Sequence, residues 1–139
     1  VHATAHTADV LKFLARDARL APADQRRLLE AAWRRMTAPG TPVFTHAEDE
    51  RLAAALVSVV RRGDFDPGLL DAWLARFAEQ EQAVWRSAPP DASALAAAQN
   101  ARNLLRSFYV LVSLPQPLPT AGQESAREKL LATLQQIRR

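Results

Sequence analysis

Apolar side chains along the 139-residue chain recur every three or four positions, and clusters of proline and glycine interrupt the pattern. This spacing is typical of amphipathic helices, because residues three and four apart share one helix face. No segment alternates apolar and polar residues over the length of a strand. The pattern therefore predicts an all-α fold with six helices, near residues 2–18, 22–37, 46–62, 67–88, 91–113 and 120–137.

Capping signals support these boundaries. The segments Thr45-His46-Ala47-Glu48 and Thr120-Ala121-Gly122-Gln123 both match the capping box, in which the first and fourth residues accept each other's backbone amides. Pro22 and the Asp66-Pro67 pair are typical of a first helical turn. We expect the Pro89-Pro90 pair to break the chain between the fourth and fifth helices.

The connections between the predicted helices are short, so we expect consecutive helices to pack antiparallel. The first, third and fifth helices begin about 45 residues apart, which matches the period of HEAT-like repeats. We therefore expect a single helical domain over residues 1–139, built as a HEAT- or armadillo-like α-solenoid or as a compact α-α superhelix. Because Val1 opens the chain inside a predicted helix, we expect a C-terminal fragment of a longer protein.

Composition narrows the function classes. The chain has 16 Arg and 2 Lys against 15 acidic residues, and a net charge of only +3 disfavours nucleic-acid binding. The absence of cysteine excludes disulfides, thiolate nucleophiles and cysteine-bound zinc. No apolar run reaches the length of a membrane span. We expect a cytoplasmic domain that contacts neither membrane nor nucleic acid.

Two histidines and a carboxylate lie one turn apart near the start of the first predicted helix. His2, His6 and Asp9 share one stripe, beside an apolar face that we expect to contain Val10 and Leu14. Two histidines four residues apart can bind a divalent metal such as zinc, and Asp9 would complete the ligand set. The alternative is structural, with Asp9 orienting His6 or pairing with an arginine.

Two further carboxylates occupy positions where the pattern calls for apolar residues. Asp49 lies on the apolar face of the third helix, near the N-terminus, where the helix dipole favours an anion. Glu81 lies between Phe77 and Val84 on the apolar stripe of the fourth helix. A buried carboxylate needs a partner, so Glu81 is either paired with an arginine or serves as a ligand or general base. In an antiparallel array the following residues lie at similar heights and are candidates for one pocket, edged by Asn100 and Asn103: His2, His6, Asp9, Asp49 and Glu81.

Two segments, Val1–Leu11 (VHATAHTADVL) and Phe44–Ala53 (FTHAEDERLA), resemble the signatures of an uncharacterised bacterial family. That family is a domain of unknown function with a W-V-H-x-x-x-H-x-A-D opening and an E-D-x-R-L-A element. The resemblance implies a helical-repeat fold and no established activity. It implies these signature positions: His2, His6, Asp9, Glu48, Asp49 and Arg51. Alternatively, Arg51 has a structural role and pairs with an acidic residue on its own helix or on a neighbouring helix.

Three functions remain open. The first is a non-enzymatic binding or scaffold module for a protein or a small ligand, working without a cofactor. The second is a metal-dependent, hydrolytic site in which His2, His6 and Asp9 hold the metal, and Asp49 completes the shell or takes a proton from bound water. The third is a purely structural domain whose polar cluster fixes helix register. The candidate ligand-binding residues are His2, His6, Asp9, Glu48, Asp49, Arg51 and Glu81.

Overall fold

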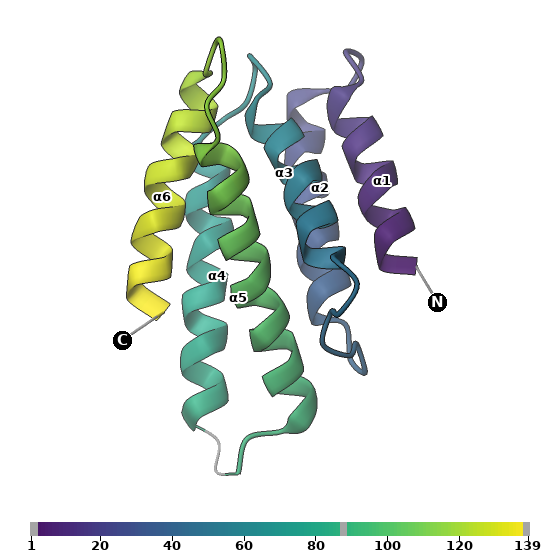
Figure 1. Ribbon diagram of the computed structural model, residues 1–139, viewed down its shortest axis with the longest axis vertical. Coiled ribbons are helices and arrows are strands. Elements are labelled where there is room, and N and C mark those ends of the chain that lie inside the picture. The colour runs from purple at the N-terminus through teal and green to yellow at the C-terminus, as the bar shows by residue number, and fades with distance from the viewer. Residues whose placement is uncertain (1–2, 87–88, 138–139) are drawn as a thin grey trace.

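The computed structural model describes residues 3–86 and 89–137, and every regular element in these ranges is an α-helix (Figure 1). The all-α prediction is confirmed, and each helix begins and ends within two residues of its predicted bounds. None of these helices is both long and apolar enough to cross a membrane. Their bounds are α1 Ala3–Arg16, α2 Pro22–Thr37, α3 Glu48–Val60, α4 Gly68–Arg86, α5 Ala92–Ser113 and α6 Ala121–Ile137.

The chain direction alternates from each helix to the next, as predicted, but the closest packing joins helices two apart in sequence (Figure 1). α1 packs on α3, and α3 packs on α5, so these three form one layer. α2 and α4 lie behind that layer, and α6 packs against both α5 and α4. The connections at 17–21, 61–67 and 114–120 share one end of the array, here called the upper end.

An aromatic cluster lies between α2 and α4. The rings of Trp73 and Phe77 on α4 meet edge to face, with centroids 4.7 Å apart, and Trp33 of α2 lies 4.9 Å from Phe77. Trp73 also donates its indole N–H to the Leu29 carbonyl, 2.9 Å away, so its polar atom is satisfied although the ring is buried. These contacts fix α4 against α2.

The buried face of α1 differs from the predicted one. Val10, Phe13 and Leu14 are 57%, 75% and 44% exposed, whereas Ala8 and Ala15 are fully buried against the rest of the core. Small residues let the α1 backbone approach α3 closely, so the alanines mark the interface. The prediction was wrong for Val10 and Leu14, which it placed inward, whereas Leu11 is buried.

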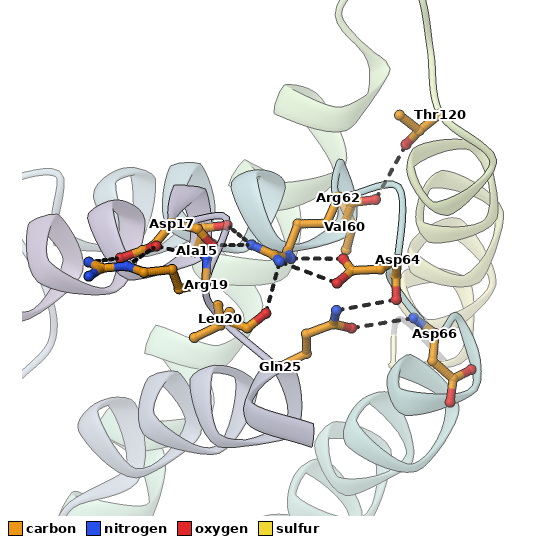
Figure 2. Close-up of polar contacts among 10 residues, drawn as sticks. All are labelled: Ala15, Asp17, Arg19, Leu20, Gln25, Val60, Arg62, Asp64, Asp66 and Thr120. Atoms are coloured by element: carbon orange, nitrogen blue, oxygen red, sulfur yellow. Dashed lines mark hydrogen bonds and ion pairs between the residues drawn. The ribbon is translucent and has the colours of Figure 1, made fainter. Parts of the chain in front are cut away.

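Arg62 ties the upper end together (Figure 2). Its guanidinium donates to the main-chain carbonyls of Ala15, Asp17 and Leu20, at 2.8, 2.9 and 3.1 Å. It also forms a two-point ion pair with Asp64. The Ala15 carbonyl lies in the last turn of α1, which the helix itself leaves without a partner, and the other two carbonyls belong to the connection after α1. The Arg62 side chain is therefore largely buried, at 12% exposed.

A buried glutamine extends the same network (Figure 2). The Gln25 amide donates to the Asp64 carbonyl at 3.2 Å and accepts the Asp66 amide N–H at 3.4 Å. The Thr120 hydroxyl donates to the Val60 carbonyl at 3.4 Å. The three connections at the upper end are thus joined through α2 and α3.

At the opposite end, Asn100 holds the connection between α2 and α3. Its side-chain oxygen accepts the Phe44 amide N–H at 2.8 Å, and its nitrogen donates to the Pro42 carbonyl at 2.9 Å. Asn100 is fully buried, so both bonds replace contacts with water. It fastens a loop rather than edging a ligand pocket.

The capping box predicted at Thr45 does not form. α3 begins at Glu48, after Ala47 in the left-handed region at a φ of 59°, and no side chain caps it. The Glu48 carboxylate accepts the amide N–H of His46 at 2.7 Å, and the Thr45 hydroxyl lies 2.9 Å from the His46 ring.

Of the capping box predicted at Thr120, one of the two hydrogen bonds forms. The Thr120 hydroxyl accepts the Gln123 amide N–H at 3.2 Å, as expected for a cap. The Gln123 side chain instead donates to the Val112 carbonyl at 3.1 Å, which fixes the end of α5 against the start of α6.

Candidate functional site

The sequence-predicted residues of α1 and α3 meet across the interface of those helices. Asp9 accepts a hydrogen bond from the Arg51 guanidinium at 3.5 Å, and both side chains are about half exposed. In this structure Asp9 therefore pairs with an arginine, and Arg51 with an acid of a neighbouring helix, as the structural alternative expects. An exposed pair of this length adds at most about 1 kcal/mol to stability.

The two neighbouring carboxylates have separate partners. Asp49 accepts a hydrogen bond from the Ser107 hydroxyl at 3.0 Å, which links α3 to α5. Burial raises the pKa of Glu48, but the backbone N–H groups of His46 and of Glu48 itself outweigh that effect, and the pKa lies below its ordinary value. In this structure Asp49 thus links two helices, and Glu48 binds the backbone just before α3.

The metal-binding prediction concerns His2, His6 and Asp9. His6 is exposed, and Asp9 faces Arg51, while His2 lies outside the described residues. Over residues 3–86 and 89–137, no three histidine or acidic side chains gather closely enough to hold a metal ion. The set that includes His2 stays a prediction.

Glu81 lies elsewhere, between α4 and α5, with an arginine as its partner. The Arg102 guanidinium donates to both Glu81 oxygens, at 3.1 Å from Nε and 2.5 Å from Nη2. The Trp85 indole N–H, one turn along α4, donates to the same carboxylate at 2.8 Å. The Glu81 side chain is only 14% exposed, so this geometry satisfies a largely buried charge.

A pocket of about 870 Å³ opens beside this ion pair, at the lower end of the array. We call it the α4–α6 pocket, because α4, α5 and α6 each supply part of its wall. Its volume lies in the range of small-molecule sites, which is about 300–1,000 Å³. Its lining residues are Ala78, Glu81, Gln82, Trp85, Arg86, Arg102, Arg106, Leu134, Gln136 and Ile137.

The wall of the α4–α6 pocket carries an excess of positive charge and a large exposed aromatic side chain. Its described lining residues include three arginines and one carboxylate, and that carboxylate already pairs with Arg102. Trp85 is 62% exposed, although the hydrogen bond to Glu81 holds its indole nitrogen. Leu134 and Ile137 on α6 form an apolar side of the pocket.

The predicted residues therefore divide into two groups. Glu81 lines the α4–α6 pocket, whereas none of His6, Asp9, Glu48, Asp49 and Arg51 does. The prediction compared only the heights of these residues along their helices. It could not include the fact that α4 lies behind the layer formed by α1, α3 and α5. The described residues of the predicted set do not share this pocket.

The sequence analysis did not single out several residues of the pocket, among them Trp85, Arg102 and Arg106. One signal was available, because Glu81 and Trp85 are four residues apart, as are Arg102 and Arg106. Each pair must share a helix face.

Comparison with known proteins places the chain in a family. The family described as "Protein of unknown function (DUF2785)" matches residues 1–110, which include α1 to α4 and most of α5, but not α6. No curated protein and no solved structure matches the chain. Because the match covers more than half of its residues, the chain belongs to the DUF2785 family of proteins of unknown function.

Proposed function

We propose that this domain is a non-enzymatic binding module, and that the α4–α6 pocket receives a small organic ligand. The observation that carries the proposal is the Glu81 carboxylate, which holds both the Arg102 guanidinium and the Trp85 indole at the pocket wall. Side chains that are already fixed lose little conformational entropy when a ligand binds. The pocket is therefore partly organised for binding.

The chemistry of the wall favours binding over catalysis. Among the described residues that line the pocket there is no serine, threonine, histidine or lysine to act as a nucleophile or a base. Its one carboxylate, Glu81, has both oxygens engaged by Arg102, and one of them also accepts the Trp85 N–H. A catalytic role would require Glu81 to give up these partners.

The test is a fragment screen followed by nitrogen–proton NMR of the three tryptophan indoles, with Trp85→Phe identifying the pocket signal. Trp73 provides an internal control, because its ring is buried and its N–H is bonded to Leu29. We expect pocket ligands to move the Trp85 signal in a saturable way while the Trp73 signal stays in place. A screen in which no compound moves Trp85 would refute the proposal.

A further inference from the structure

We infer that the ligand of the α4–α6 pocket is an organic anion with a flat, apolar body, such as an aromatic carboxylate or an aromatic phosphate monoester. This inference rests on the proposed function and adds the chemical class of the ligand. It draws on the unequal distribution of charge in the pocket and on the exposed ring at its wall.

The positive charge of the pocket is only partly neutralised. Arg102 uses Nε and Nη2 for Glu81, which leaves Nη1 without a hydrogen bond in the described structure. Arg106 lies one turn further along α5 and forms neither a hydrogen bond nor an ion pair with any described residue. Within the described part of the chain, Arg86 donates its one hydrogen bond to the neutral Gln82 side chain, at 3.2 Å. Guanidinium groups bind carboxylates and phosphates through paired N–H donors, so the α5 wall is suited to an anionic group.

The remaining walls suit an apolar body. Trp85 exposes most of its surface on the α4 side, and Leu134 and Ile137 lie on the α6 side. A flat ring that enters between them would bury apolar area on both faces, whereas its charged end would reach the arginines. A cationic ligand would meet uncompensated arginines, and a long polyanion would find no continuous basic track in a pocket of about 870 Å³.

The experiment uses matched acid and neutral pairs as probes: 2-naphthoate with 2-naphthamide, and 2-naphthyl phosphate with 2-naphthol. Affinities come from the Trp85 indole signal in the wild-type chain and in two variants, Arg106→Gln and Arg61→Gln. Arg61 is the control, since it is also exposed and lies at the upper end, next to Arg62.

We expect the acids to bind about tenfold more tightly than their neutral partners, because charge-assisted hydrogen bonds are the stronger ones. Arg106→Gln should remove most of this preference without weakening the neutral probes, and Arg61→Gln should leave every affinity unchanged. Preference for the carboxylate over the phosphate, or the reverse, would distinguish the two sources of charge, and either would support the inference.

Two results would overturn the inference, and they separate it from the proposed function. If acid and neutral probes move the Trp85 signal with equal affinity, the pocket binds ligands but the anionic class is wrong. If neither these probes nor any compound of the fragment screen moves Trp85, both the inference and the proposed function fail.

Discussion

Replacing Arg62 with alanine should cost this domain about 2–4 kcal/mol of unfolding free energy. The side chain is only 12% exposed, and it donates to three main-chain carbonyls as well as to Asp64. Each hydrogen bond contributes about 1 kcal/mol net, and bonds from a charged donor contribute more. In the variant, water can reach some of the carbonyls that Arg62 had bound. The expected loss of unfolding free energy is therefore smaller than the summed contribution of the same bonds in a fully buried site.

Urea unfolding followed by circular dichroism would measure this loss. Arg61→Ala is the matched control, because Arg61 is the exposed neighbour, and we expect its effect to stay within about 0.5 kcal/mol. Arg62→Lys should fall between the two, since an ammonium group retains the charge but cannot donate in the same planar fork. Equal stability of the Arg62→Ala and Arg61→Ala variants would refute the argument that Arg62 holds the upper end together.

Three other predictions test different parts of the structure. Gly122→Ala should destabilise the domain by at least about 2 kcal/mol, because the added Cβ would overlap the Val60 carbonyl oxygen, whereas Gly63→Ala enters open space and should be nearly neutral in the same urea assay. Leu11→Ala should cost about 2–4 kcal/mol and Phe13→Ala less than about 0.5 kcal/mol; the reverse order would contradict the observed face of α1. The hydrogen bond from Arg76 lowers the pKa of Glu30 below 4.5, so the Glu30–Arg76 pair stabilises the fold above that pH, and this stabilisation is lost as the pH falls through the lowered pKa. NMR titration should show the Glu30 midpoint rising towards 4.5 in the Arg76→Gln variant.

The helices could be predicted from sequence because their signals are local. Large apolar residues recur at helical spacing in α2 to α5, and Pro22 begins α2 where expected. The errors arose where distant contacts decide the outcome. Asn100 fixes the loop before α3 from a helix more than fifty residues away, and Thr45 therefore does not act as the cap that its local motif predicts.

The candidate site was predictable only in part, for a related reason. Glu81 stood out as a carboxylate in an apolar stripe, and the need of a buried charge for a partner correctly indicated an arginine. The sequence contains 16 arginines, and nothing local distinguishes Arg102 from the others. The height of a residue along its helix can be predicted by counting residues. Its sideways position depends on which layer the helix joins, and the sequence does not show that. That is why Asp49 and Glu81 were expected together and lie apart.

The position of the α4–α6 pocket follows from helix length and from the fixed upper end. The connection between α5 and α6 is tied there through Thr120, so α5 ends and α6 begins at the upper end. With 22 residues α5 extends about 33 Å, whereas the 17 residues of α6 extend about 26 Å. α4 and α5 continue downwards past the end of α6, as Figure 1 shows, and the pocket beside that end is lined by Glu81, Trp85 and Arg102. The Glu81–Arg102 ion pair at this position is mostly shielded from water but keeps one side open, and our binding proposal depends on that arrangement.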